Sequence, residues 1–327
     1  MAQDYARRPE PFGQYQLKRL IATGGMAEIF EARKQGAHGF ERRVAIKRIL
    51  PALRTDPRFQ EMFCEEARIQ ASLAHPNIVE VLDFGQVEGR LFMALEYVDG
   101  LTCSDLIDRL LKRHRTVDLA ATLFVLREVL RGLAFLHSAC DSWGQPLDLV
   151  HRDIAPNNVL ISKVGQVKIA DFGIYYSRHA VRHTAPGELK GKIGYISPEQ
   201  ARGDQVDGRS DLFSLAVMAA EMLIGKALFQ GETVLDVFDS LNRGDLTMLH
   251  AHGDHVPDDV KQVLARALQP NPDKRYANAT SFGTDVQWLA QRHGLEMESY
   301  DFTEWLADLG LIALESQVNV VPPARKP

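Results

Sequence analysis

The sequence predicts an α+β fold of two lobes, in which a small antiparallel sheet precedes a larger, mainly helical part. Short segments rich in β-branched and aromatic residues, separated by glycine-bearing turns, fill about the first hundred residues. Apolar residues recur with the helical period through most of the remaining chain. The length of 327 residues corresponds to about two units of roughly 150 residues, enough to bury a core in each lobe.

The small lobe is predicted as a five-stranded antiparallel sheet crossed by one helix. The expected strands cover residues 15–23, 27–33, 43–50, 79–85 and 90–97. The helix lies between Thr55 and Ala74, because Asp56 can cap its N-terminus and Pro57 suits the first helical position.

The larger lobe is expected to be helical, with long helices at residues 119–137 and 211–224. The second is apolar enough to be buried nearly all round. The boundary between the lobes falls at residues 98–100, where Gly100 can serve as a hinge. The predicted organisation is an N-terminal extension (1–14), the small lobe (15–98), the helical lobe (99–293) and a C-terminal tail (294–327).

The tail contains one amphipathic pattern. Large apolar residues at i, i+3, i+4 and i+7 form a stripe on a short helix that begins near Asp301: Phe302, Trp305, Leu306 and Leu309. The stripe is expected to pack on the helical lobe. The alternative is that it docks a partner or a second copy of the chain.

Charge and composition exclude several classes of function. A net charge of −5 leaves no global positive field for nucleic acid or anionic lipid. No apolar run reaches the roughly 18 residues of a membrane span, and the N-terminus lacks an apolar signal segment, which favours a cytoplasmic protein. Three widely spaced cysteines without a CxxC pair are interpreted as structural thiols: Cys64, Cys103 and Cys140.

Two further segments are interpreted as surface structure. His250, His252 and His255 lack the spacing of a metal site with a fourth ligand and are assigned to a solvated loop. Residues 138–149, with Gly144 near the centre, are expected to form a surface hairpin.

A glycine-bearing turn between the first two strands contains Ile21, Ala22, Thr23, Gly24 and Gly25. Such a turn can bring backbone N–H groups against phosphate oxygens, although by itself it also fits an ordinary hairpin. The residues that follow strengthen the phosphate interpretation. Lys47 lies late in the third strand, and Glu66 follows 19 positions later on the predicted helix, where its carboxylate could hold the lysine.

A second set of polar residues follows the strand–helix region. Asp153 ends the run His151-Arg152-Asp153, Asn158 comes five positions later, and Asp171 begins Asp-Phe-Gly 18 positions after Asp153. Two carboxylates and an amide oxygen provide hard ligands and a proton acceptor, the set that magnesium-dependent phosphoryl transfer uses.

In this order the motifs resemble those of the eukaryotic-like (Hanks-type) serine/threonine protein kinases, particularly the bacterial members, over residues 15–293. The resemblance implies the bilobal protein-kinase fold, with a five-stranded N-lobe sheet plus one helix and a mainly helical C-lobe. It also implies ATP in the cleft between the lobes, Mg²⁺ as cofactor, and protein substrates.

The resemblance also implies roles for individual residues. Lys47 should contact the α- and β-phosphates and pair with Glu66, Asp153 should accept the substrate hydroxyl proton, and Asn158 and Asp171 should hold magnesium. The remaining nucleotide contacts are expected from the glycine-rich turn (Ala22, Thr23, Gly24, Gly25), from apolar residues around the base (Ile21, Ile29, Ala45, Leu160) and from the backbone of Glu96 and Val98. Asp211 and the pair Glu199–Arg275 match structural positions of the family.

The sequence departs from the family pattern at three places. Alanines stand at 22 and 27 where the family has glycines, which could weaken ATP binding without abolishing it. Ala155 replaces the lysine that usually neutralises the γ-phosphate, and Lys192 stands where a threonine is usual. Lys192 is therefore proposed to supply the missing charge. The alternative is a solvated lysine in an impaired enzyme.

The leading function is transfer of the γ-phosphoryl of ATP to serine or threonine hydroxyls, including autophosphorylation, with a homodimer as one arrangement for transfer between copies. The alternatives are a pseudokinase scaffold that binds ATP and acts through partners, and a small-molecule phosphotransferase. In the segment between Gly173 and Glu199, Thr184 and then Ser177 are the preferred sites for a phosphate that pairs with Arg152.

Overall fold

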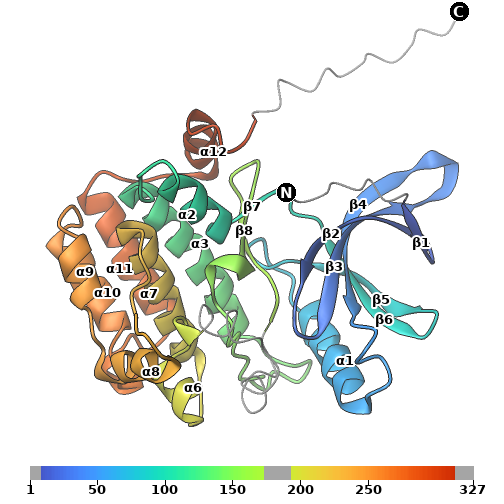
Figure 1. Cartoon of the computed structure of the whole chain (residues 1–327), viewed down its shortest axis with the longest axis horizontal. Helices are drawn as coiled ribbons and strands as arrows, with labels where there is room; N and C mark the ends of the chain where they lie inside the picture. Colours follow the sequence, from blue (N-terminus) through green and yellow to red (C-terminus); the bar gives the residue numbers. More distant parts are fainter. Residues whose placement is uncertain (1–8, 173–192, 314–327) are drawn as a thin grey trace, which may run out of the picture.

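A curled sheet and a larger group of helices lie side by side and are joined by one short connection (Figure 1). The structure is a computed structural model that describes residues 9–172 and 193–313. The α+β architecture with a sheet lobe and a helical lobe is as predicted.

The N-lobe sheet has six strands, in the order β1-β2-β3-β4-β6-β5, with every neighbouring pair antiparallel. The strands are β1 (Glu10–Phe12), β2 (Tyr15–Thr23), β3 (Ala27–Gln35), β4 (Glu41–Ile49), β5 (Val81–Val87) and β6 (Arg90–Glu96). A short 3-10 turn, η1 (Ala37–Gly39), joins β3 to β4.

The prediction of five strands was wrong by one, because β1 lies inside the segment assigned to an extension. Three residues, one of them Pro11, are too few to show strand periodicity. The strand forms because Phe12 is buried against Phe92 and because Glu10 forms an ion pair with the buried Arg48. Both contacts depend on residues far along the chain.

Helix α1 (Pro57–Ala71) crosses the sheet as predicted. The Asp56 side chain accepts a hydrogen bond from the Arg58 amide, and Pro57 occupies the first turn, so the N-terminus forms by local chemistry alone. Its buried face presents Phe63 and Ala67 to the sheet and brings Glu66 toward the cleft.

A second sheet of three short strands lies beneath the connection between the lobes: β7 (Gly100–Thr102), β8 (Val159–Ser162) and β9 (Val167–Ile169). Gly100 starts β7, where an added Cβ would stand 1.9 Å from the Ile161 carbonyl oxygen. The glycine is therefore required by this close approach between strands, which the hinge interpretation did not foresee.

The C-lobe is built on α3 (Leu119–His137) and α7 (Gly208–Ile224), which pack against each other in one large core. The other helices are α2 (Cys103–Leu111), α6 (Pro198–Arg202), α8 (Val234–Arg243), α9 (Thr247–His252), α10 (Asp258–Ala267), α11 (Ala279–Arg292) and α12 (Ser299–Asp308), with 3-10 turns η2 (Pro156–Asn158) and η4 (Pro272–Lys274). Helix α3 has the predicted bounds. Helix α7 is buried all round as expected, and starts three residues earlier because Asp207 caps it.

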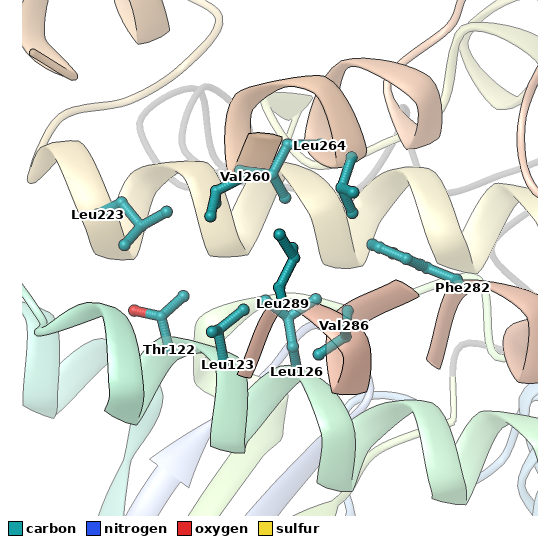
Figure 2. Close-up of a pocket in the computed structure, with 10 residues that line it drawn as sticks. Thr122, Leu123, Leu126, Leu223, Val260, Leu264, Phe282, Val286 and Leu289 are labelled. Carbon is teal, nitrogen blue, oxygen red and sulfur yellow. The ribbon is translucent and has the colours of Figure 1, made fainter. Parts of the chain in front are cut away.

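The centre of this core is tightly packed. Side chains of α3, α7, α10 and α11 converge around a void of about 10 Å³, lined by apolar groups and Thr122 (Figure 2). The Thr122 hydroxyl is already bonded to the Asp118 carbonyl. The void is far below the volume of a ligand site, so this region serves to position other elements.

Helix α12 packs on the C-lobe, which is the arrangement expected from its apolar stripe. It starts at Ser299, two residues before the predicted position, and Phe302 and Leu306 are fully buried. The rings of Phe302 and Phe124 lie 4.7 Å apart, and the Trp305 indole donates to Asp118.

Residues 138–149 form the expected hairpin, with a bridge between Cys140 and Pro146 and an exposed Trp143 at its tip. Cys103 is buried, whereas Cys64 is half-buried and Cys140 is exposed, so the structural interpretation fits Cys103 best.

The loop predicted around His250 is helical in part, because α9 covers His250 and His252. Just before this helix, the Asp245 carboxylate accepts hydrogen bonds from the Thr247 amide and hydroxyl. Within residues 9–172 and 193–313 there is no group of three His, Cys, Asp or Glu side chains suited to a metal ion, and no helix with the length and hydropathy that a bilayer crossing needs.

Candidate active site

Lys47 of β4 lies between the two lobes, where the family resemblance implies the nucleotide cleft. Its Nζ is 2.6 Å from Glu66 Oε1 on α1 and 2.9 Å from Asp171 Oδ1 after β9. The pairing with Glu66 predicted from the spacing is therefore present. Burial alone would lower the pKa of Lys47, but the carboxylates of Asp171 and Glu66 outweigh it and raise this pKa above its ordinary value. The ammonium stays charged and faces the cleft from the N-lobe.

The loop of residues 151–158, called the catalytic loop below after the role expected of Asp153, brings Asp153 and Asn158 together on the C-lobe side. The Asn158 amide donates to the Asp153 carbonyl at 2.7 Å and to Asp153 Oδ2 at 2.9 Å. Because its Nδ2 is used in this way, the Asn158 Oδ1 atom is the end left to face a cation. The turn η2 shapes this part of the loop, with Pro156 at its first position.

Asp211 on α7 holds the start of this loop. Its two carboxylate oxygens accept from the amides of His151 and Arg152, each at 2.8 Å, and His137 Nε2 also lies 2.8 Å from Oδ2. Arg152 has a left-handed backbone with φ of 65°, a conformation that costs energy for a non-glycine residue. The Asp211 bond to its amide and the Gln200 bond to its carbonyl support that conformation.

His151 is fully buried beneath the loop. Its ring lies 4.8 Å from the Phe172 ring, and its Nε2 atom lies 3.2 Å from the Ala170 carbonyl. Burial lowers the pKa of His151, so the ring is neutral and acts as a spacer between the loop and the segment that ends in Asp171. Asp171 itself has a positive φ of 54°.

The glycine-rich turn joins β2 to β3 and is closed by a hydrogen bond from the Gly24 amide to the Ala27 carbonyl. Ala22 and Ala27 lie in the strands, with extended backbones that alanine adopts freely. A Cβ added at Gly25 would meet no atom within 4 Å. The protein alone thus does not require glycine there, although approaching phosphates could.

Three of the predicted base-binding residues gather on one apolar cluster although they come from different elements. Ala45 of β4, Val98 of the connection between the lobes and Leu160 of β8 pack against the cluster around Met93 and Leu95. Ile29 is half-buried in β3, and Ile21 is more exposed, at 44%. These five residues remain predictions as base contacts.

Glu96 is the last residue of β6 and leads into residues 97–99, the connection between the lobes that is called the hinge below. Glu96 is held by contacts that the sequence analysis missed. Its amide donates to the Glu80 carbonyl at 2.9 Å, and its carboxylate accepts from Lys168 at 2.7 Å. The expected backbone contact from Glu96 to adenine would therefore have to use its carbonyl oxygen. Lys168 lies between the buried Val167 and Ile169 on β9, so strand alternation was the signal that it faces the other side.

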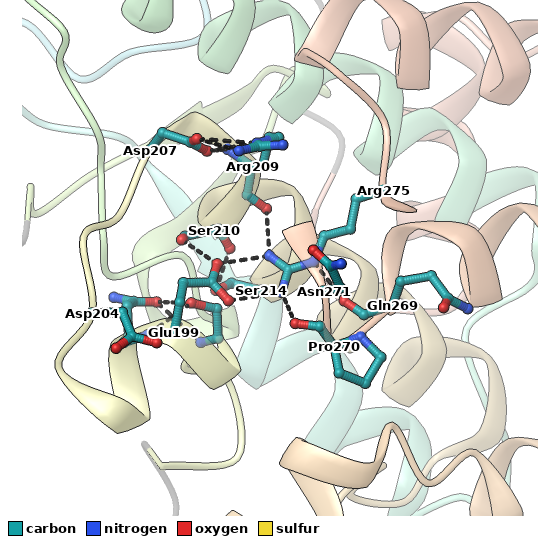
Figure 3. A network of polar contacts seen from close by, with 12 residues as sticks. Glu199, Asp204, Asp207, Arg209, Ser210, Ser214, Gln269, Pro270, Asn271 and Arg275 are labelled. Atoms are coloured by element: carbon teal, nitrogen blue, oxygen red, sulfur yellow. Dashed lines mark hydrogen bonds and ion pairs between the residues drawn. The ribbon is translucent and has the colours of Figure 1, made fainter. Parts of the chain in front are cut away.

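Glu199 and Arg275 form a buried, bidentate ion pair, with both N···O distances at 2.7 Å (Figure 3). The guanidinium also donates to the carbonyls of Gln269, Arg209 and Pro270, which uses all five of its N–H groups. The bonds to Arg275 and Ser210 outweigh burial and lower the pKa of Glu199. This network fixes α6 to the C-lobe.

The donor set fits a magnesium ion. Asn158 Oδ1 and the Asp171 carboxylate are hard oxygen donors, and Mg²⁺ in such sites is usually held by one or two carboxylates together with substrate phosphates. The remaining predicted catalytic residue, Lys192, lies outside the described residues, as do Gly173, Ser177 and Thr184.

Comparison with known protein families shows which family the chain belongs to. The family description "Protein kinase domain" matches residues 15–286. The chain belongs to the protein kinase family.

Several bacterial kinases are similar in sequence. The chain is 41% identical over 87% of its length to "Tyrosine-protein kinase MasK" of Myxococcus xanthus. It is 36% identical over 84% of its length to "Serine/threonine-protein kinase PknA" of Mycobacterium tuberculosis, and 30% identical over 84% to "Serine/threonine-protein kinase PrkC" of Bacillus subtilis. These matches cover 44%, 61% and 40% of the respective relatives, so the chain spans only part of their length.

A solved structure shares the fold. The crystal structure of the Mycobacterium tuberculosis PknI kinase domain superposes with a TM-score of 0.62 at 26% identity, over 86% of this chain and 98% of the other. The superposition therefore includes both lobes of the fold.

Proposed function

We propose that this protein is an active protein kinase that transfers the γ-phosphoryl group of ATP to serine and threonine hydroxyls of proteins. The observation that carries the proposal is that Lys47 bonds both Glu66 and Asp171, while the bond from the Ala170 amide to the Asn158 carbonyl ties the Asp153–Asn158 pair to the segment that carries Asp171. A scaffold that only binds partners has no need of this set, which argues against the pseudokinase alternative.

In the proposed reaction, the charged Lys47 holds the α- and β-phosphates while Glu66 fixes its position. Asp153 accepts the proton of the substrate hydroxyl as the new oxygen–phosphorus bond forms and the bond to ADP breaks. Asn158 keeps the Asp153 carboxylate oriented through its amide. Magnesium, held by Asn158 Oδ1 and Asp171, would neutralise charge on the phosphates.

The three relatives differ in the hydroxyl group that their names give as the phosphate acceptor. One is named a tyrosine kinase, and two are named serine/threonine kinases. We favour serine and threonine as the acceptor residues, because the motifs of this chain resemble those of the bacterial serine/threonine kinases. Ala155 provides no cation near the γ-phosphate, and we propose that Lys192 supplies it. Lys192→Ala should then slow phosphoryl transfer by at least about tenfold, with nearly unchanged nucleotide affinity.

The test is incubation with Mg²⁺ and ATP, followed by mass spectrometry of the modified residues. Wild-type protein should gain phosphate on serine or threonine, with Thr184 and Ser177 as the first sites to inspect. Asp153→Asn should reduce the rate by roughly 100- to 10,000-fold, and Lys47→Met should also abolish useful turnover. Equal incorporation in wild type and Asp153→Asn would contradict the proposal.

Two other results would redirect it. Phosphate only on tyrosine would overturn the hydroxyl specificity while leaving the kinase assignment. Nucleotide binding without any transfer would favour the pseudokinase scaffold. An autophosphorylation rate per molecule that rises with protein concentration would support transfer between copies, as in a homodimer.

A further inference from the structure

Helix α12 lies beyond the segment that matches the kinase family, which ends at residue 286. It is nevertheless held firmly against α2 and α3, as Figure 1 shows at the top of the C-lobe. The contacts are the Phe302–Phe124 ring pair, the Trp305 hydrogen bond to Asp118 at 2.7 Å, the Glu298–Arg127 ion pair at 3.2 Å, and bonds from Arg109 and Arg113 to the carbonyls of Leu311 and Leu309.

The turn between β8 and β9 lies directly beneath the first turn of α12. Gly165 has a φ of +71°, and a Cβ added there would stand 2.0 Å from the Ser299 carbonyl oxygen and 2.7 Å from Thr303 Oγ1. No side chain fits in this space. The position of α12 and the position of this turn are therefore linked by direct contact.

The same turn holds the hinge. The Lys163 amide donates to the Asp99 carbonyl at 2.8 Å, and Lys163 Nζ lies 3.1 Å from Asp99 Oδ2. That carboxylate oxygen also accepts from Arg43 of β4 at 3.0 Å. Partial burial alone would raise the pKa of Asp99, but Lys163 and Arg43 outweigh it and lower this pKa. Asp99 thus joins the C-lobe turn to the N-lobe sheet.

A cavity of about 400 Å³ lies between these parts. Tyr97, Val98 and Asp99 line it on the hinge side, and Thr303 and Ala313 line it on the α12 side. Glu96 of β6 and residues of β8, of β9 and of the turn between them complete the lining. The cavity separates α12 from the hinge, and the β8–β9 turn contacts both of them.

We propose that α12 sets the position of the hinge through the β8–β9 turn, with Lys163 as the positioning residue, so that displacing the helix weakens nucleotide binding in the cleft. The nucleotide part rests on the proposed function. The link between helix and hinge does not.

The test uses Gly165→Ala in the full chain, because the added methyl group must push against α12. Gly144→Ala is the matched control: its φ is +79°, so it carries similar backbone strain, but its Cβ would meet no atom within 4 Å. The first readout is hydrogen exchange of the Lys163 amide without nucleotide. Gly165→Ala should accelerate that exchange by about tenfold relative to Gly144→Ala.

The second readout is the dissociation constant for ATP. Gly165→Ala and Lys163→Met should each raise this dissociation constant about threefold, with little change in kcat. An increase of that size is expected from the loss of a partly exposed ion pair. Lys163→Arg keeps the charge and should keep the wild-type affinity. The double variant should be no weaker than either single one, because both act on one link. Should Gly165→Ala fail to fold, Trp305→Phe loosens α12 by removing the indole N–H bond to Asp118 and part of the ring that stacks on Phe302, and should change the exchange and the affinity in the same direction.

Unchanged Lys163 exchange in folded Gly165→Ala, or in Trp305→Phe, would overturn the link. Independent, multiplying effects of Gly165→Ala and Lys163→Met on ATP affinity would overturn it as well. A wild-type protein that binds no ATP would instead contradict the proposed function, and the exchange experiment would still decide the mechanical link.

Discussion

The two walls of the cleft are stabilised in different ways. On the C-lobe wall, the loop that carries Asp153 is bonded to the buried Asp211 of α7, a helix enclosed on all sides. On the N-lobe wall, the turn around Gly24 and Gly25 is exposed and crosses between two strands. The difference teaches that the groups expected to handle the proton are held by hydrogen bonds within the C-lobe, whereas the turn expected to cover the phosphates has few protein neighbours.

The largest effect is expected from the ion pair that supports the C-lobe wall. Arg275→Ala should lower the free energy of unfolding by about 3–5 kcal/mol, because it leaves the Glu199 carboxylate buried without its partner. Urea denaturation at neutral pH measures the loss.

Arg209→Ala is the control for this substitution, since Arg209 bonds to the exposed carboxylates of Asp207 and Asp273. It should cost about 1 kcal/mol or less. Equal losses in the two variants would show that burial of the Glu199 pair contributes nothing special.

A pH dependence should come from Glu221, a buried carboxyl on α7 that accepts from Tyr195 and from the Leu228 amide. Burial raises the pKa of Glu221 from 4.5 to about 7. The folded protein then binds more protons than the unfolded chain between these values, so this contribution to stability is lost as the pH rises through 7.

Glu221→Gln removes this titration. The unfolding free energy of wild type minus that of the variant should fall by up to about 3 kcal/mol between pH 4.5 and pH 8. Denaturation curves at four pH values test it, and a difference independent of pH would mean that Glu221 titrates normally.

A smaller effect is expected from Asp211→Asn, which sharpens the comparison at the catalytic loop. The asparagine amide cannot accept from both the His151 and Arg152 amides, so about 1–3 kcal/mol of stability should be lost. The kcat should fall while the dissociation constant for ATP stays near its wild-type value. Weakened ATP binding with an intact kcat would contradict the assigned role of this wall.

The smallest change in stability is expected on the N-lobe wall. Gly25→Ala should alter the free energy of unfolding by less than about 0.5 kcal/mol, because the new methyl group meets no protein atom within 4 Å. It should raise the dissociation constant for ATP, since it stands where phosphates would approach. Ala22→Gly is the reverse test and should not weaken ATP binding; a large loss of stability in either variant would show that this turn is more constrained than its exposure indicates.

Much of the local structure could be predicted because its causes are local. Asp56 and Pro57 start α1 by capping, and the periodic apolar residues of 119–137 define α3 with the observed bounds. The β1 strand could not be predicted, because Phe12 and Glu10 depend on Phe92 and Arg48. The hinge contact of Lys168 with Glu96 was missed for the same reason, since it joins residues 72 positions apart.

The candidate site divides in the same way. The sequence alone predicted the chemistry, because carboxylates, a lysine and an amide in a fixed order can be recognised from the residue types. Only the tertiary structure decided that Lys47 meets both Glu66 and Asp171, which lies 124 positions away, and that Asp211 carries the catalytic loop. Capping and periodicity act over a few residues of chain, whereas these distances depend on strand order and on how α7 packs inside the C-lobe.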